Sequence, residues 1–401
     1  MVSPFLDRQH GTELCIIEQI ERLAGKEHWE IHLYSQRVEQ LEGIGPAEYP
    51  TDNETWRIFW HKIPEIPGPH LVKYTWWFIA NQFRRWRDKR SGRVCADLTY
   101  SAGINCLDAD VIAVHIVFHE FYARVKPELA LRRLPVRTWP LILHRKLYYK
   151  LIMSLERLIY RNSNVRLIAV SSHVARQLKL HFGRTDVAVI PNSADTERFN
   201  VEGRNARRIE SRKSFGFSET DFVILFIGND WKKKGLDALL RACVLLAELP
   251  WRLMVVGRDD ERAYEEMLQQ PELRGRVRFE KPSADVLKFY AAADLYISPS
   301  LEDAFGLPIL EAMACGIPVI ASIQAGASEN IRDGETGVLL QDPRSAEEIA
   351  ERIRLLFTEV ALRNKIGISA AKFAEGNCSW DQNARKTKEI LEATREERGK
   401  Q

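Results

Sequence analysis

The chain has 401 residues, of which 45% are hydrophobic, so it can bury the cores of two or three domains. Its six cysteines are scattered without a Cys-x-x-Cys pair or histidines at metal-ligand spacing, which argues against a zinc site or a disulfide framework and favours reduced, buried thiols in a cytosolic protein. No apolar run reaches transmembrane length, and we expect no signal peptide.

The charge is distributed unevenly along the chain. The formal net charge is only +3, yet residues 73–184 contain 21 Lys and Arg and 7 Asp and Glu, so the remainder is acidic overall.

The first half alternates apolar strands with helical stretches. Met1–Phe5 reads as the end of a first strand, which is either abbreviated or preceded by further residues, and the loop Asp7–Glu13 leads into a helix over Leu14–Leu23. We expect further strands at Trp29–Ser35, Trp56–His61, Arg93–Tyr100 and Asp110–His115 with a helix between each pair, then a helix at Leu141–Tyr160, a strand at Val165–Val170, a helix to His181 and a strand at Val187–Ile190. This alternation predicts a parallel, doubly wound sheet.

The segment His70–Arg93 combines aromatic and cationic residues on one predicted helix. That combination suits the surface of an anionic membrane, although a surface helix whose aromatic residues pack on the sheet explains it equally well. Nucleic-acid binding uses similar residues, but no nucleic-acid motif accompanies them. The basic helix Leu141–Tyr160 either widens this patch, binds an anionic acceptor or presents a solvated face.

Polar residues follow two of the predicted strands. Asn105 comes after one strand end, and His115 and His119 come after the next. The carboxyl ends of strands line the ligand crevice in open α/β sheets, so these three are candidates to face a ligand, with His115 first. The alternative is that each is structural.

The second half begins with a polar linker at Asn200–Lys213, which places a domain boundary near residues 195–210. A buried strand at Asp221–Gly228 then runs into a basic loop with Lys233 and Lys234, and a helix follows at Leu236–Leu246. Cations beside a helix N-terminus form a natural diphosphate clamp; the alternative is a solvated charged run. A further strand, Trp251–Gly257, ends at Arg258, another crevice position, and Val277–Glu280 is the next strand.

The stretch from Asp294 to Ala321 reads as strand, loop, helix and strand. Pro308 suits a first helical turn and Gly316 a helix end. The loop delivers backbone N–H groups and a helix N-terminus to one point, as phosphate sites do, and Asp303 and Glu311 can bind hydroxyl groups of an extended ligand. The alternative is an ordinary βαβ unit with a coincidental acid pair. A hairpin at Gly334–Leu340 and three helices follow, the last starting at Ser379–Trp380.

These motifs resemble the retaining glycosyltransferases of family four, which have the GT-B fold. Seven residues separate Asp303 from Glu311 around a Phe-Gly-Leu-Pro loop, Ile190–Phe199 resembles the family's crossing segment, Lys234-Gly235 matches its second basic position, and Ala325–Glu329 resembles its small-residue turn. The chain departs from the family at four positions: Asp303 replaces Glu, Asn229 replaces Arg, and Ser193 and His10 replace Gly. The two adjacent lysines are closer to the branch of lipopolysaccharide-core glucosyltransferases. Glu302 stands one residue out of the expected spacing.

The resemblance implies two Rossmann-like, doubly wound domains facing across a cleft. We expect an acceptor-binding domain at 1–198, a nucleotide-sugar donor domain at 199–379 and a C-terminal helix at 380–397 that packs back on the first. The resemblance further implies a metal-independent, hexosyltransferase-type enzyme without a cofactor. In the catalytic roles we expect Asp303, His115 and Lys234, and in substrate binding Gly11, Asn105, His119, Lys233, Arg258, Ala304, Phe305, Gly306, Leu307 and Glu311.

The expected partners are a UDP- or GDP-sugar, a saccharide or lipid-linked acceptor and an anionic membrane surface, but no nucleic acid. The protein would act in the cytoplasm, peripherally on the inner face of the cell membrane, in the synthesis of cell-envelope polysaccharide, lipopolysaccharide or glycolipid. Two alternatives stay open: a soluble GT-B enzyme (a disaccharide synthase or a nucleotide-sugar epimerase), and a catalytically silent nucleotide-sugar-binding protein.

Overall fold

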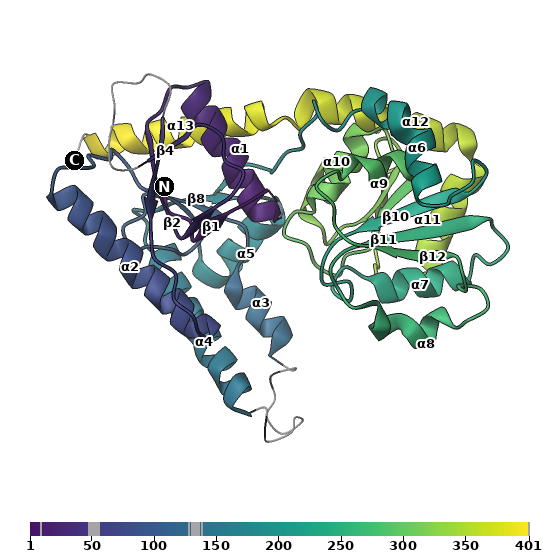
Figure 1. Cartoon of the computed structure of the whole chain (residues 1–401), viewed down its shortest axis with the longest axis horizontal. Coiled ribbons are helices and arrows are strands. Elements are labelled where there is room, and N and C mark those ends of the chain that lie inside the picture. The colour runs from purple at the N-terminus through teal and green to yellow at the C-terminus, as the bar shows by residue number, and fades with distance from the viewer. Residues whose placement is uncertain (9, 47–56, 127–128, 130–136, 138, 400–401) are drawn as a thin grey trace. The chain divides into compact units, whose positions relative to one another are not determined.

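The computed structural model describes residues 1–8, 10–46, 57–126, 129, 137 and 139–399, and it forms two compact units (Figure 1). The first unit is Met1–Pro191 with Asn383–Gln401, and the second unit is Asn192–Gln382. The chain thus divides at Pro191, before the expected boundary at residue 198, and returns at Asn383.

The first unit is built on parallel strands. Its strands are β1 (Phe5–Leu6), β2 (Ile31–Ser35), β3 (Arg37–Val38), β4 (Ile44–Pro46), β5 (Ile58–Lys62), β6 (Tyr100–Ala102), β7 (Val111–Val114), β8 (Arg166–Ala169) and β9 (Ala188–Val189). One run of strands is ordered β2-β5-β4 and another β6-β7-β8-β9. Val2 joins the two runs, because it bridges Tyr34 on one side and Ser101 on the other, both in parallel.

Helices cover both faces of this sheet. They are α1 (Gly11–Gly25), α2 (His70–Arg90), α3 (Phe118–Val125), α4 (Trp139–Tyr160), α5 (Ser172–Phe182) and, from the end of the chain, α13 (Trp380–Gly399). Apolar residues of α1 and Leu391 of α13 share a core with alternate residues of the strands. Gln19 of α1 also donates to Asn383 at 2.8 Å. From Asn383 onward the last helix is therefore part of the first unit.

Two expectations for the first unit were wrong, and two others fall partly outside the described residues. Residues 93–99 form no strand, because α2 continues to Arg90 and the chain then turns at Gly92 (φ 72°), so β6 begins only at Tyr100. The connection between Ala102 and Val111 contains no helix. Of the connection between β2 and β5, residues 36–46 include β3 and β4, and the rest of the span where a helix was expected lies outside the described residues. Trp56 of the predicted third strand lies outside the described residues, and β5 begins at Ile58.

The second unit contains one parallel sheet in the order β12-β11-β10-β13-β14-β15. Its strands are β10 (Phe222–Ile227), β11 (Trp251–Val256), β12 (Val277–Glu280), β13 (Leu295–Ser298), β14 (Val319–Ser322) and β15 (Val338–Leu340). Its helices are α6 (Val201–Ser214), α7 (Leu236–Val244), η3 (Glu261–Tyr264), α8 (Glu265–Leu268), α9 (Leu287–Ala292), α10 (Leu307–Ala314), η4 (Gly326–Asn330), α11 (Ala346–Thr358) and α12 (Val360–Asn377). The pair α7 and α11 packs against one face of the sheet, and α9 and α10 lie on the other face, backed by α6 and α12 (Figure 1).

The predicted strand at Val277–Glu280 and the three closing helices are confirmed. The predicted hairpin at Gly334–Leu340 was wrong. The chain turns between Asp333 and Gly337, and β15 then pairs in parallel with β14, so the sheet gains an edge strand instead.

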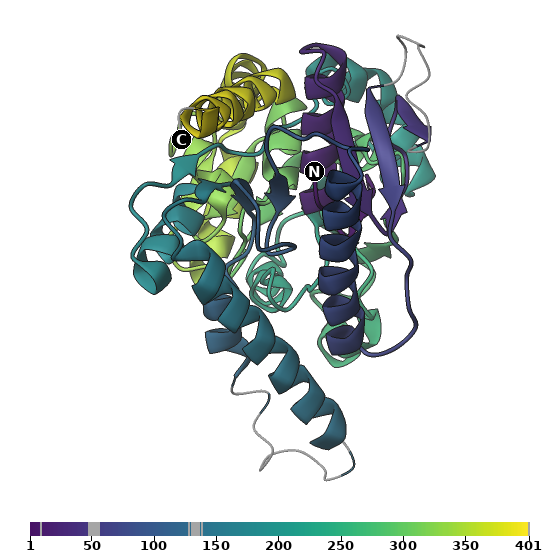
Figure 2. The same ribbon diagram turned by 90° about the vertical axis from the view of Figure 1, so that its left-hand side faces the viewer.

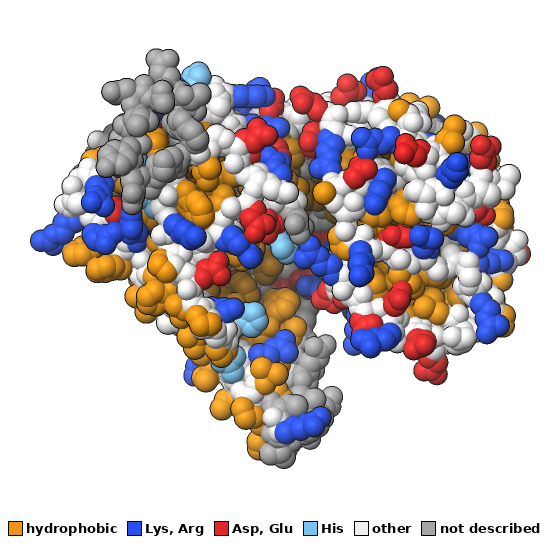
Figure 3. Space-filling view, viewed as in Figure 1, with side chains coloured by type: hydrophobic (Ala, Val, Ile, Leu, Met, Phe, Trp, Pro, Cys, Tyr) orange, Lys and Arg blue, Asp and Glu red, His pale blue; other side chains and the backbone are white. Residues whose placement is uncertain are grey.

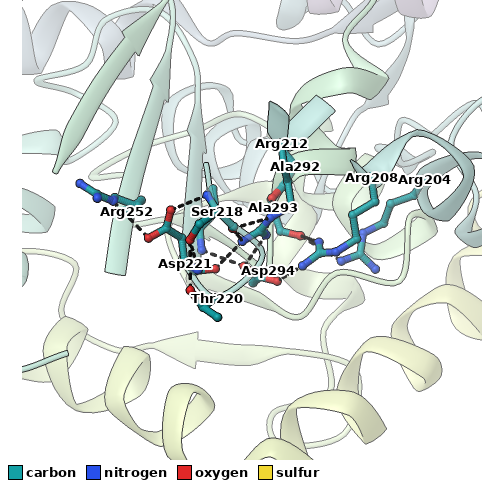
Figure 4. Close-up of polar contacts among 11 residues, drawn as sticks. Arg204, Arg208, Arg212, Ser218, Thr220, Asp221, Arg252, Ala292, Ala293 and Asp294 are labelled. Carbon is teal, nitrogen blue, oxygen red and sulfur yellow. Dashed lines mark hydrogen bonds and ion pairs between the residues drawn. The ribbon is translucent and has the colours of Figure 1, made fainter. Parts of the chain in front are cut away.

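The predicted linker at Asn200–Lys213 was also wrong, because these residues form α6. Asn200 caps the helix by accepting from Gly203 N at 2.7 Å. Three arginines at four-residue spacing, Arg204, Arg208 and Arg212, give the stretch its linker-like charge, yet they point from one face of the helix toward the end of α9 (Figure 4).

Asp294 is the centre of this arginine cluster. Its carboxylate pairs with Arg208 and with Arg212, the latter at 3.0 Å, and it accepts from Val223 N at 2.8 Å. Arg204 donates to Ala293 O at 2.9 Å (Figure 4). Asp294 thereby links α6 to the amino ends of both β10 and β13 through ion pairs and a backbone hydrogen bond.

We predict that Arg212→Met lowers the free energy of unfolding by about 3 kcal/mol. Arg212 is buried, and its loss leaves carbonyl oxygens and part of the Asp294 carboxylate without their hydrogen-bond donor. Urea unfolding of the full chain measures this. Arg207→Met on the same helix is the matched control. Its ion pair with Asp285 is exposed, so the change should cost less than about 1 kcal/mol. Equal costs for the two variants would contradict the prediction.

Candidate functional site

The sheet of the second unit has its topological switch point between β10 and β13. From β10 the chain moves outward to β11 and β12, and it then returns on the other side to β13, β14 and β15. Neighbouring parallel strands whose connections leave in opposite directions open a crevice at their carboxyl ends. Two loops meet there: residues 228–235 after β10, and residues 299–306 after β13.

The loop after β10 is fixed by its own polar residues. Trp231 is buried and donates from Nε1 to Gly228 O at 2.9 Å. Asn229 accepts from the backbone N–H of Arg258 at 3.0 Å, so it ties the end of β10 to the end of β11. The residue at 229 therefore has a bracing role here, and the cations of the loop come after it.

Backbone contact joins the two loops. Leu301 N donates to Lys233 O at 2.9 Å. Gly235 adopts φ 83°, and a Cβ built on it would lie 2.0 Å from Pro299 O, so only glycine permits this approach. The contact sets Lys233 opposite Glu302, with 3.4 Å between Nζ and Oε2, and Lys234 opposite Asp303 in a direct ion pair.

Asp303 lies at the N-terminus of α10. Its Oδ1 accepts from Phe305 N at 3.3 Å. Gly306 caps the helix with φ 92°, and a Cβ there would lie 3.0 Å from Asp303 Oδ2. The backbone of Asp303 is also held, since its N–H donates to Gln324 O at 3.1 Å. This carboxylate thus sits where a helix N-terminus and a lysine favour a negative charge.

The neighbouring residues of the motif supply backbone more than side chains. Phe305 and Leu307 are buried in the core, Phe305 O accepts from Ala327 N at 2.7 Å, and Ala304 is half-buried. Whatever they offer a ligand comes from the loop backbone and the first turn of α10.

Glu311 stands just over one turn along α10, half-buried beside α9. Tyr290 donates to its Oε2 at 2.6 Å, and burial raises the pKa of Glu311 above the ordinary range of a glutamate. Both acids of the spaced pair are therefore on the loop–α10 segment, each already held by a neighbour.

The candidates of the first unit lie at the carboxyl ends of its strands, as predicted, but they are held differently. His115 follows β7 and is buried, which lowers its pKa to about 4, so its ring is neutral at pH 7. Asn105 accepts from Trp77 Nε1 at 3.1 Å and donates to Ala102 O, so its amide braces α2 against the loop. Gly11 is the exposed first residue of α1.

His119 belongs to a helix cap. Glu156 of α4 is fully buried and accepts from the backbone N–H groups of Phe118 and His119, at 2.7 and 3.0 Å, which caps α3. His119 Nδ1 lies 2.6 Å from the same carboxylate. Burial lowers the pKa of His119 to about 4. This geometry favours a structural role for the His119 ring.

Sequence reasoning missed three partners: Glu302, which pairs with Lys233, Tyr290, which holds Glu311, and Glu156, which caps α3. The buried Glu156 in a basic helix was a signal for a capping role. No sequence pattern pointed to Glu302, because its ion pair arises from the contact of two loops that are far apart in sequence. In the part of the chain that the structure describes, no group of three or more His, Cys, Asp or Glu is arranged to hold a metal ion.

Two family models match the chain in succession. The model described as "Glycosyltransferase Family 4" matches residues 10–198, and the model described as "Glycosyl transferases group 1" matches residues 207–373. The second match includes both loops of the switch point.

Individual relatives agree with these matches. The lipopolysaccharide glucosyltransferase WaaG of Escherichia coli (strain K12) is 30% identical over 191 residues, which cover 46% of this chain and 50% of WaaG. The D-inositol 3-phosphate glycosyltransferase of Rhodococcus opacus (strain B4) is 33% identical over 235 residues, or 55% of this chain and 51% of the relative. The chain thus spans about half the length of the relatives it matches.

Solved structures extend the likeness over the whole fold. The crystal structure of WaaG superposes with a TM-score of 0.76 at 20% identity and covers 97% of this chain and 98% of that one. Anabaena Alr3699/HepE in complex with UDP-glucose gives a TM-score of 0.67 at 18% identity, with 98% and 100% coverage. The fold is that of the GT-B glycosyltransferases, with parallel strands and covering helices in each of two domains.

We predict that Gly235→Ala destabilises the second unit and separates its two loops, because the new methyl would overlap Pro299 O. Gly216→Ala is the matched control: Gly216 has φ 71°, but a Cβ added there would have nothing within 4 Å. The control should cost about 1–2 kcal/mol of unfolding free energy from backbone strain, and Gly235→Ala about 2 kcal/mol more from overpacking. Urea unfolding distinguishes the two, and equal losses would show that the loops do not depend on this contact.

Proposed function

Because the chain belongs to the family 4, or group 1, glycosyltransferases, we propose that it transfers a sugar from a nucleotide-diphosphate sugar to an acceptor hydroxyl, with retention at the anomeric carbon. The observation that carries the proposal is the meeting of Lys233, Lys234 and Asp303 with the N-terminus of α10 at the switch point. A structural neighbour, HepE, was solved with UDP-glucose, which supports a UDP-sugar donor.

The leaving diphosphate gains negative charge as the glycosidic bond breaks. Lys233, Lys234 and the N–H groups at the start of α10 stabilise that charge more strongly in the transition state than in the bound donor. Arg258, at the end of β11, adds a third cation at the same edge of the sheet. No step of this scheme needs a metal ion.

The carboxylates bind the rest of the donor. Asp303 holds hydroxyls of the transferred sugar and shields the developing oxocarbenium ion, and Glu311 binds the ribose. Aspartate in place of glutamate keeps the carboxylate close to Gly306 and to Lys234. His115, neutral and at a strand end of the first unit, is the candidate to hydrogen-bond the acceptor or the sugar.

We assign the acceptor to the cell envelope: a polysaccharide, lipopolysaccharide or glycolipid intermediate. The likeness to a lipopolysaccharide glucosyltransferase supports this class. Among the described residues, no helix is both long and apolar enough to cross a bilayer. A lipid-linked acceptor lies at a membrane surface, and a matching surface on the protein would give access to it.

The exposed face of α2 and α4 offers such a surface. The two helices, whose ribbons Figure 2 shows, contact each other. Together they expose ten large hydrophobic side chains, and Figure 3 shows hydrophobic side chains gathered over this part of the molecule. These are Val72, Trp76, Ile79, Phe83, Trp86, Trp139, Leu141, Leu143, Leu147 and Leu158. On α2 they recur at alternating spacings of four and three, which places them on one stripe.

The face formed by α2 and α4 is positively charged. The helices α2 and α4 carry ten Lys and Arg residues and two acids, and both acids, Asp88 and Glu156, are buried. A second copy of the chain would meet this face with charge of the same sign, whereas an anionic lipid surface complements it. We therefore propose peripheral binding to the cytoplasmic face of an anionic membrane.

For the transfer reaction, we predict that Lys234→Ala and Asp303→Ala each lower kcat/KM by about 10²-fold or more. The lysine stabilises the negative charge of the leaving diphosphate, and the aspartate stabilises the positive charge that develops on the sugar. Release of nucleoside diphosphate from UDP- and GDP-sugars, with a lipid-linked acceptor and EDTA present, measures this. Lys232→Ala is the matched control, because Lys232 is exposed on the same loop, and it should change activity by less than about twofold. Full activity in both site variants, or a metal requirement, would contradict the mechanism.

For the membrane face, we predict that the protein co-floats with vesicles containing anionic phosphatidylglycerol and dissociates as salt rises. The double change Phe83→Ser and Trp86→Ser should abolish flotation, since it removes two exposed apolar anchors. Ile209→Ser, at an equally exposed apolar residue of α6, should leave flotation intact. Absence of co-flotation in the unaltered protein would favour a soluble acceptor.

A further inference from the structure

Glu302 lies beside the proposed donor site but outside the spaced acid pair. We propose that Glu302 is a positioning residue that occupies Lys233 while the donor site is empty, and that the donor diphosphate displaces it. This inference rests on the proposed function, and it assigns to Glu302 control over the affinity of the site for diphosphates.

The first observation is the register of the loops. Two consecutive lysines face two consecutive acids: Lys233 faces Glu302 at 3.4 Å, and Lys234 pairs directly with Asp303. The backbone bond from Leu301 N to Lys233 O, at 2.9 Å, fixes this register. The backbone geometry therefore places the two lysines opposite the two acids, and the side chains complete the two pairs.

The second observation is the low exposure of the four side chains. Glu302 and Asp303 are 14% and 15% exposed, and Lys233 and Lys234 are 34% and 23% exposed. Charges this far from bulk water interact more strongly than surface ion pairs do. The four charges sum to zero, so without rearrangement the pairs offer a diphosphate no net attraction.

The third observation is that Asp303 already acts as an anion at this site. Its carboxylate binds Lys234, accepts from Phe305 N and lies against the N-cap of α10. These are the groups that bind a phosphate at a helix N-terminus. The carboxylates of Glu302 and Asp303 therefore stand where part of the diphosphate charge is expected.

Glu302 is better suited to withdraw than Asp303. The Asp303 side chain is short, and its backbone is bound to the segment at residues 324–326 on both sides. Glu302 has one more methylene and can swing away, which would leave Lys233 to the ligand. Asp303 stays beside Lys234 in its proposed role at the sugar.

Isothermal titration of the full chain with inorganic pyrophosphate, UDP and GDP tests the proposal. Glu302→Gln should tighten pyrophosphate binding about threefold to tenfold at low salt, and less at high salt, because it removes a competing charge. Glu248→Gln is the matched control. It removes the same charge from an ion pair with Arg354, beyond the far end of α7, and it should change nothing.

A double-mutant cycle isolates the pair. Lys233→Met should weaken binding, and in that background Glu302→Gln should lose most of its effect, because the cation that Glu302 occupies is gone. In steady-state kinetics, Glu302→Gln should lower the donor KM without raising kcat, since the product diphosphate is also held more tightly. A general loss of structure would not produce this combination.

The outcomes separate the two proposals. Diphosphate binding that Glu302→Gln leaves unchanged or weakens would overturn the role of Glu302 while the transferase proposal stands. The same tightening in the Lys233→Met background would also overturn it. The expected tightening without transfer from any sugar nucleotide would overturn the proposed function alone. No binding of pyrophosphate, UDP or GDP by either protein would overturn both.

Discussion

The donor site of the second unit depends on one close approach of backbone to backbone. Gly235 lies against the carbonyl of Pro299, and Leu301 donates to Lys233 O. Two features of the site follow from this contact: the register of two lysines against two acids, and the concentration of charge at the switch point of the sheet. A side chain at 235 would separate the groups that the chemistry needs together.

Burial shapes the chemistry around this contact. Glu311 is held by Tyr290 at a position where burial raises its pKa. In the first unit, burial keeps His115 neutral, while Glu156 and Asn105 serve helix α3 and helix α2. Some polar residues at the strand ends therefore stabilise the fold, and others are available to a ligand. Residues close together in the sequence can belong to different groups.

Much of the second unit could be predicted from sequence, because strands such as Phe222–Ile227 are short apolar runs and the loop–helix motif has fixed spacing. The errors had physical causes. The arginines of α6 read as a solvated linker because their partners, Ala292 to Asp294, are distant in sequence. Residues 93–99 contain the apolar residues of a strand but serve to turn the chain after α2. Glu302 could not be found from spacing, since only the contact between loops gives it a partner.

The Asp294 cluster, at the amino ends of the strands, also affects the carboxyl ends of the same strands. Asp294 links β10 to β13 at their amino ends, while Gly235 and Pro299 link the loops at their carboxyl ends. A six-residue strand such as β10 is about 20 Å long, so these two strands are pinned at both extremities and resist sliding past each other. A mutation in α6 that touches no ligand can therefore change the register of the lysines relative to the acids. A substitution at Arg212 would then lower catalytic activity, although Arg212 lies at the other end of the strands.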